Sequence, residues 1–365
     1  MSSYTYEITI TLNSKSNRSL YTISSAPYAN CPTGSGDLIK IDDSCIRIIA
    51  NRTKKFEQED ILSNSSNSIY IQILKALLCY NSITKSPQKL LTLQIKRISY
   101  FSRKNSKVET IANITYSDKN QPIKILSLTA PIKKNVLNLL WSRTNEPEYL
   151  VPALSHWLSA MSSEDRYFTF ERLWRSFERI VFYIGSKQGK ITEKDCLCAT
   201  RNFLVSNSSI FPKTMALASK ITYNDFRALS WRKLILNNYG KPGTNNLYKG
   251  YRDYFVKLNS DTRILQMIED TLTFREERLN NFGYYVDIQN YLARKNRSPQ
   301  TKDEEIVAII CCKYAYFVRN KMFHGENRDV YFSLSTETSD DKSLDLVNDI
   351  LRELVSEFIG VFDQI

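Results

Sequence analysis

The stretch SSEDRYFTFERLWRSFERIVFYIG, residues 162–185, decides the fold of the C-terminal part of this chain. Its large apolar side chains recur at spacings of three or one, as they do on the buried face of an amphipathic helix. Glu164 and Asp165 stand at its start, where acidic side chains favour the first turn of a helix. Gly185 follows the last apolar residue, so the pattern predicts a helix that ends before this glycine.

A helical period governs the whole chain from Pro131 to the C-terminus. Polar segments that contain Pro or Gly separate the periodic ones. We therefore expect residues 131–365 to form an all-α domain, a bundle of helices. The helices besides the one above are predicted over residues 132–141, 153–161, 192–205, 224–238, 260–280, 284–294 and 304–322, and from residue 343 onward.

Residues 1–130 follow a different pattern, in which apolar and polar side chains alternate. The segment YTYEITITL, residues 4–12, alternates strictly and is rich in β-branched and aromatic residues, which is typical of a strand. We expect an α+β domain here, with a mostly antiparallel sheet and one or two helices. The strands are predicted over residues 4–12, 45–50, 90–101, 108–116 and 123–128, and a helix over 66–80.

The composition is that of a globular protein in a reducing compartment. The apolar runs are far shorter than the roughly 18 residues that span a membrane, and the N-terminus alternates where a secretory leader would be apolar. The seven cysteines are odd in number, and with the two histidines they form no spacing typical of zinc sites. We therefore expect a cytoplasmic protein with no cofactor, no metal and no membrane partner.

The net charge of +12 is unevenly distributed along the sequence. Residues 1–140 contain 19 Lys and Arg against 9 Asp and Glu, whereas the rest of the chain contains 31 against 29. This asymmetry favours a polyanionic partner, with RNA or DNA the leading candidates. The alternative is a surface whose charge only keeps the protein soluble.

Two groups of residues are candidates for contact with RNA. Lys96, Arg97, Arg103, Lys104 and Lys107 form the densest basic cluster, and on a hairpin they would project as one patch suited to phosphates. Further along, an expected loop combines aromatic and basic side chains, which can stack on bases and hold phosphates. Its members are Tyr248, Lys249 and Arg252.

The segment RNKMFHG, residues 319–325, carries the candidate chemistry. Asn320 and His324 are four residues apart and share a face if the helix continues through them, and the long side chain of Arg319 reaches the same space. Such a set can transfer a proton at His324 and stabilise negative charge at phosphorus through Arg319 without a metal. Glu178, beside the apolar stripe of residues 162–185, is a candidate to orient Arg319 or His324.

These residues resemble the R-x4-6-H signature of HEPN-domain proteins, in which an Asn often follows the Arg. The segment Phe-x-x-Leu-Trp-x-x-Phe-Glu, residues 170–178, is similar to the helix that packs behind the catalytic one in several HEPN families. The resemblance covers at most residues 136–365. It implies a metal-independent endoribonuclease in a defence, CRISPR-associated or toxin context, with a homodimer that brings two copies of the motif into one composite site.

Three other readings of the sequence stay open. Residues 319–325 also suit a helix C-terminus stabilised by cations and followed by glycine. A non-catalytic HEPN-like adaptor would use the helical domain to dimerise and to bind nucleic acid or nucleotide. A DNA-binding regulator would rely on the basic N-terminal third, whose domain could equally bind RNA, a regulatory protein or another nucleic-acid partner.

Overall fold

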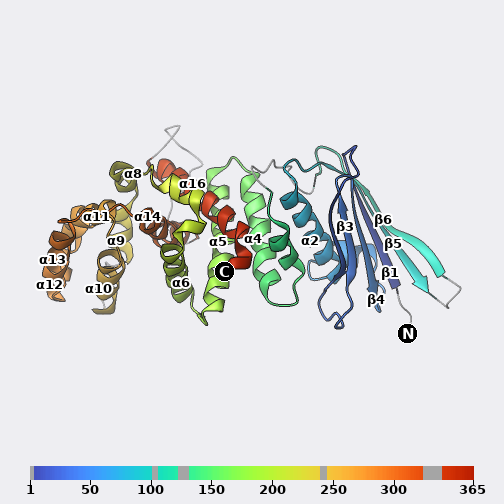
Figure 1. Ribbon diagram of the computed structural model, residues 1–365, viewed down its shortest axis with the longest axis horizontal. Coiled ribbons are helices and arrows are strands. Elements are labelled where there is room, and N and C mark those ends of the chain that lie inside the picture. The colour runs from blue at the N-terminus through green and yellow to red at the C-terminus, as the bar shows by residue number, and fades with distance from the viewer. Residues whose placement is uncertain (1–3, 101–105, 122–130, 239–244, 324–338) are drawn as a thin grey trace. The chain divides into compact units, whose positions relative to one another are not determined.

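The structure, a computed structural model, falls into two compact units (Figure 1). The sheet unit comprises Met1–Ser162 and Ile359–Ile365, and the helical unit comprises Ser163–Phe358. Each has its own buried apolar core. The structure describes residues 4–100, 106–121, 131–238, 245–323 and 339–365.

The sheet unit is built on six antiparallel strands in the order β2-β3-β4-β1-β5-β6. Tyr6, Ile8 and Ile10 are buried while Glu7 is exposed, as the alternation of residues 4–12 predicts. The strands are β1 (Tyr4–Leu12), β2 (Ser19–Ala26), β3 (Asp37–Asp42), β4 (Cys45–Arg52), β5 (Leu90–Tyr100) and β6 (Ser106–Thr115).

Helix α2 (Ser68–Ile83) covers the buried face of the sheet over β3 and β4, and the short α1 (Gln58–Leu62) precedes it. The side chain of Asn67 caps α2 by accepting a hydrogen bond from the Ile69 amide. The α+β layout of the first part and the helical layout of the second are thus confirmed. Strands β2 and β3 were not predicted, and the strand expected over residues 123–128 lies outside the described residues.

The sheet unit also contains helices that the sequence assigned to the helical domain. They are α3 (Lys134–Asn138), the 3-10 turn η1 (Leu139–Trp141) and α4 (Glu146–Met161). Trp141 explains this placement, because its indole Nε1 donates to Gln72 Oε1 at 2.9 Å and its ring stacks on Tyr21 with centroids 5.3 Å apart. The compact units therefore divide at Ser162, not at the expected boundary after residue 130.

The helical unit begins with α5 (Arg166–Lys187), which continues past Gly185 to Lys187. A Cβ at position 185 would overlap Cys196 Sγ, so glycine serves here for close contact with α6 and not as a helix end. The helices that follow α5 are α6 (Glu193–Ser206), α7 (Pro212–Ala218), α8 (Tyr223–Ala228), α9 (Trp231–Asn238), α10 (Asn245–Tyr251), α11 (Thr262–Leu272), α12 (Glu276–Asn281), α13 (Tyr285–Lys295), α14 (Asp303–Ile309), α15 (Ala315–Phe323) and α16 (Ser339–Gly360). Three further 3-10 turns are η2 (Ser208–Ile210), η4 (Thr273–Arg275) and η6 (Phe362–Gln364), the last of which belongs to the sheet unit.

Two segments of the helical unit are π-helical, η3 (Arg252–Lys257) and η5 (Ile310–Tyr314). The segment η5 joins α14 to α15, so the predicted helix over 304–322 is one continuous rod with a wider turn at its middle. An aromatic cluster formed by Phe177, Phe203, Phe211 and Phe358 ties α5, α6 and α16 together. Within the described ranges, every helix is too short or too polar to cross a bilayer.

Candidate functional site

The candidate site lies in the helical unit, where the last turn of α15 meets α5 and α6. Arg319, on α15, directs its guanidinium at a carboxylate from each of the other helices. Its Nη2 is 3.2 Å from Glu178 Oε1 and 3.8 Å from Glu193 Oε1. The structure therefore brings Glu178 to Arg319, as the sequence suggested, and adds Glu193, which sequence reasoning missed.

Tyr316 fixes the position of Glu193 from one turn earlier on α15. Its hydroxyl donates to Glu193 Oε2 at 3.2 Å. The ring of Tyr316 lies 6.0 Å from that of Trp174 on α5, centroid to centroid, and the Arg319 guanidinium lies 6.0 Å from the Tyr316 centroid. One tyrosine thus links the aromatic face of α5 to Glu193 and Arg319.

Asn320 completes the described part of the motif. Its side-chain Oδ1 accepts a hydrogen bond of 2.9 Å from Arg319 Nη1. The side chains of Arg319, Glu178 and Glu193 are 27%, 21% and 29% exposed, so the group is partly accessible to solvent. His324 lies outside the described residues, directly after the last described residue of α15.

The net charge of Arg319 and its two carboxylate partners determines which ligands this site can bind. Two carboxylates face one guanidinium, so Arg319, Glu178 and Glu193 together are negative by one charge. Carboxylates attract and orient a guanidinium, which keeps its fork in one plane. An incoming phosphate would therefore need cations from neighbouring residues as well as Arg319. Lys194, the exposed residue after Glu193 on α6, is one such neighbour.

The described members of the basic cluster predicted around residue 96 do not share one face of the sheet. Lys96 and Arg97 are adjacent in β5 and therefore point to opposite faces of the sheet. Arg97 is only 1% exposed and pairs with Glu57 Oε1 at 3.0 Å and Glu109 Oε2 at 2.7 Å. The expectation that Arg97 projects toward phosphates was wrong. Its side chain is buried, and its guanidinium already pairs with two carboxylates. Lys96 is partly exposed and Lys107 is exposed, whereas Arg103 and Lys104 lie outside the described residues.

The second RNA-contact prediction is also corrected. Tyr248 is fully buried in α10 and stacks on Phe282 with centroids 4.7 Å apart, so its ring cannot take a base. Arg252 pairs with Asp253 at 3.0 Å and lies over the Tyr284 ring. Only Lys249 is exposed. The expected loop is in fact helical, because its aromatic side chains pack inward.

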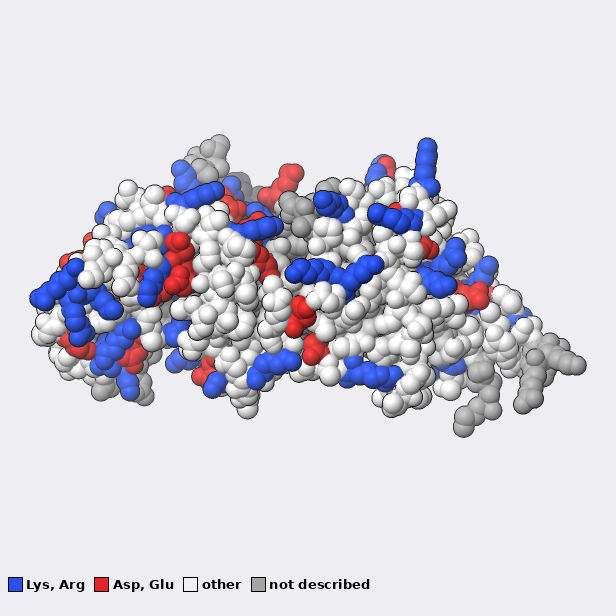
Figure 2. All heavy atoms as spheres, in the orientation of Figure 1, with Lys and Arg blue, Asp and Glu red and all other residues white. Residues whose placement is uncertain are grey.

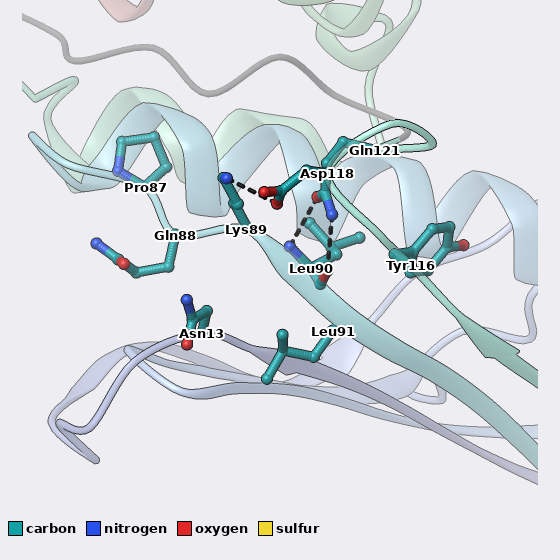
Figure 3. Close-up of a pocket in the computed structure, with 9 residues that line it drawn as sticks. All are labelled: Asn13, Pro87, Gln88, Lys89, Leu90, Leu91, Tyr116, Asp118 and Gln121. Carbon is teal, nitrogen blue, oxygen red and sulfur yellow. Dashed lines mark hydrogen bonds and ion pairs between the residues drawn. The ribbon is translucent and has the colours of Figure 1, made fainter.

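A polar hollow opens in the sheet unit beside the start of β5 (Figure 3). Its volume is about 450 Å³. Lys89 Nζ pairs with Asp118 Oδ1 at 2.7 Å across it, and the Gln121 amide bonds both the amide and the carbonyl of Leu90. Its two charged side chains, Lys89 and Asp118, therefore pair with each other.

Figure 2 shows Lys and Arg side chains interspersed with acidic and neutral ones over the drawn face, with no continuous basic stripe. Among the residues with described positions, no three His, Cys, Asp or Glu side chains are placed to share a metal ion. No protein-family model, curated protein or solved structure matches this chain. The function must therefore be argued from the site itself.

Proposed function

We propose that this protein is a metal-independent endoribonuclease of the HEPN type, with Arg319, Asn320 and His324 as its catalytic residues. The observation that supports the proposal is the contact between Arg319 and Glu178. Glu178 stands in the aromatic helix that the resemblance places behind the motif, and its carboxylate fixes the direction of the guanidinium. Glu193 also contacts Nη2 of this guanidinium, and Asn320 accepts from its Nη1.

The chemistry follows from the three side chains. His324 accepts the proton of the ribose 2′-hydroxyl, and the oxygen attacks the adjacent phosphorus. Arg319 stabilises the charge that grows on the non-bridging oxygens, and Asn320 orients the phosphate. The 5′-oxygen leaves with a proton from His324 of a second copy of the chain. The products are a 2′,3′-cyclic phosphate and a 5′-hydroxyl, and DNA, which has no 2′-hydroxyl, is not cut.

The test is incubation of the purified protein with total RNA in EDTA, followed by analysis of the product ends. We expect cyclic phosphate ends, with His324→Ala lowering the rate by about a hundredfold or more. His156, the only other histidine, lies in α4 of the sheet unit, and His156→Ala is the matched control. Cleavage by His324→Ala at the rate of His156→Ala would disprove the proposal.

The second candidate is a non-catalytic HEPN-like adaptor that binds nucleic acid or nucleotide. The charge balance at Arg319 favours it, because two carboxylates already compensate the guanidinium. An adaptor predicts RNA binding that persists in His324→Ala and no cyclic phosphate product. The DNA-binding regulator loses support, since Arg97 is buried and compensated.

A further inference from the structure

Three cations gather beside the candidate site on a surface that the sequence did not single out. Lys194 and Arg201 belong to α6, where a separation of seven residues places them on one face about 10 Å apart along the axis. Lys313 comes from the π-helical segment η5. We call Lys194, Arg201 and Lys313 the cationic track.

One aromatic ring organises this track. Lys313 Nζ lies 5.2 Å from the centroid of the Tyr254 ring, and Arg201 Cζ lies 5.6 Å from the same centroid. Both cations therefore share one ring, which lowers the cost of bringing two like charges together. Arg201, Lys313 and Tyr254 are each partly exposed and Lys194 is exposed, so the track borders solvent.

The two track residues on α6, Lys194 and Arg201, differ from many other cations of this chain in their charge partners. Within the described ranges, neither Lys194 nor Arg201 lies within ion-pair distance of a carboxylate, and Arg201 donates only to the amide oxygen of Asn202. Burial and then repulsion from Lys194 lower the pKa of Lys313 to about 8. A polyanion bound across the three groups would relieve this repulsion.

The backbone around the track is unusual in two separate places. Tyr254 lies in the π-helical segment η3 and Lys313 in the π-helical segment η5. Such wide turns are rare and occur frequently at functional sites. Here two π-helical segments that are far apart in sequence carry the Tyr254 ring and the Lys313 ammonium, which lie next to each other.

The track lies next to the candidate site. Lys194 follows Glu193, whose carboxylate contacts Arg319 and Tyr316, so the track begins beside the candidate site and continues along α6. We propose that the cationic track binds the phosphate backbone of single-stranded RNA on one side of the scissile bond. The choice of RNA rests on the proposed function, whereas the anion site rests on the geometry alone.

The experiment measures binding without cleavage. A labelled single-stranded oligouridylate is titrated with the full-length His324→Ala protein, and fluorescence anisotropy is followed at several salt concentrations. Arg201→Gln and Lys313→Gln should each weaken binding on the order of tenfold. Each should also reduce the slope of log affinity against log salt by about 0.7, as expected when one phosphate contact is lost.

The matched control is Arg232→Gln, because Arg232 also lies over an aromatic ring, Phe274, at 4.9 Å in the same unit. Arg201→Lys keeps the charge and should retain most of the affinity. Should Lys313→Gln fail to fold, the exposed Lys194→Gln replaces it.

Two results would overturn the proposal: track variants that bind like Arg232→Gln, or a protein that binds no oligouridylate. Track-dependent binding by a wild-type protein that leaves no cyclic phosphate ends would support the track and remove the nuclease assignment. The two proposals therefore fail separately.

Discussion

Arg97 in the sheet unit and Arg201 in the helical unit show two opposite ways in which a fold uses an arginine. Arg97 is 1% exposed, and Glu57, Glu109 and the Phe56 carbonyl all accept from it or pair with it. Arg201 is partly exposed, lies over Tyr254 and has no carboxylate within ion-pair distance in the described chain. The first arginine holds strands together, and the second is left available to an outside anion.

This difference shows why a charge count along a sequence does not locate a binding surface. The first 140 residues carry most of the positive excess. Yet two of their arginines, Arg52 and Arg97, are buried in ion pairs with Asp37, Glu57 and Glu109. The cationic track lies in the part of the chain where positive and negative charges nearly cancel. What matters is the pairing of each cation, and pairing depends on tertiary contacts.

The largest expected effect concerns the structural arginine. Arg97→Ala should lower the free energy of unfolding by about 3 kcal/mol, because a buried side chain and its bonds to the Phe56 carbonyl and two carboxylates are lost. Lys96→Ala, the neighbour on the opposite face, should cost less than about 0.5 kcal/mol. Urea denaturation measures both values. If the two variants lost the same free energy of unfolding, Arg97 would contribute no more to the fold than the partly exposed Lys96.

The next largest effect concerns RNA cleavage and the ion pair of Arg319, a cation that has acidic partners within the candidate site. Glu178→Gln should lower the rate of RNA cleavage by about 10- to 100-fold, because the guanidinium loses the carboxylate that orients it. Glu171→Gln removes a carboxylate from the same helix that pairs with Arg175 instead, and it is the control. Unchanged cleavage by Glu178→Gln would mean that the pair only stabilises the fold.

A smaller effect concerns Lys75, a lysine that is 8% exposed and forms no ion pair with the described residues. Burial lowers its pKa from 10.5 to about 8. Between these values the unfolded chain binds more protons than the folded one, so stability rises as pH increases from about 8 to about 10.5. Lys75→Met should abolish this rise and raise the free energy of unfolding at neutral pH by about 1–2 kcal/mol.

The control for that measurement is the exposed Lys85→Met, whose pH profile should follow the wild type. Denaturant titrations at a series of pH values give the comparison. Parallel profiles for Lys75→Met and the wild type would show that the Lys75 ammonium stays hydrated in the folded protein.

The smallest effect concerns the pH dependence of the track. Because the pKa of Lys313 is lowered to about 8, RNA affinity of the His324→Ala protein should fall about threefold as pH rises through that value. Lys313→Arg should remove the fall. Lys194, Cys198 and Arg201 face Lys313 from α6, and Tyr254 and Cys312 also lie close.

Of these neighbours, Cys198 carries a thiol beside Lys313, so Cys198→Ser is the control for its contribution. It should leave the pH profile in place. A flat profile in the parent protein would place Lys313 outside the binding surface.

Much of the fold could be predicted from the sequence because the two periods are clear. Strand β1 agrees with its predicted range, and helix α5 agrees with its own apart from its two ends. Helix α5 begins at Arg166, and Asp165 caps it where the sequence placed an acid in the first turn. Gly185 suggested a stop, but its contact with Cys196 across two helices cannot be read from local sequence. The division of the compact units at Ser162 depends on contacts such as that of Trp141 with Gln72, which join residues far apart in the chain.

The candidate site was only partly accessible to sequence reasoning. Glu178 was found because it borders an apolar stripe and carries the right charge. Glu193 and Tyr316 gave no comparable signal, because their meeting with Arg319 depends on how α6 packs against α15. The available weak signal for Glu193 was its place at the start of a predicted helix. Tyr248 was predicted to contact RNA but is buried. An aromatic residue beside basic ones can lie in the core as readily as on the surface.

The π-helical segment η5 also determines which way the side chains of α15 point around the helix axis. Each residue of an α-helix advances about 100° around the axis, and a wide turn accommodates one extra residue without ending the rod. Loss of a single residue between Ile310 and Tyr314 would leave a continuous helix but rotate Arg319 away from Glu178 and Glu193. An insertion or deletion at this turn would therefore change the register of the helix after it. The Arg319 guanidinium would lose its contacts with Glu178 and Glu193, while the hydrophobic core before the turn would stay intact.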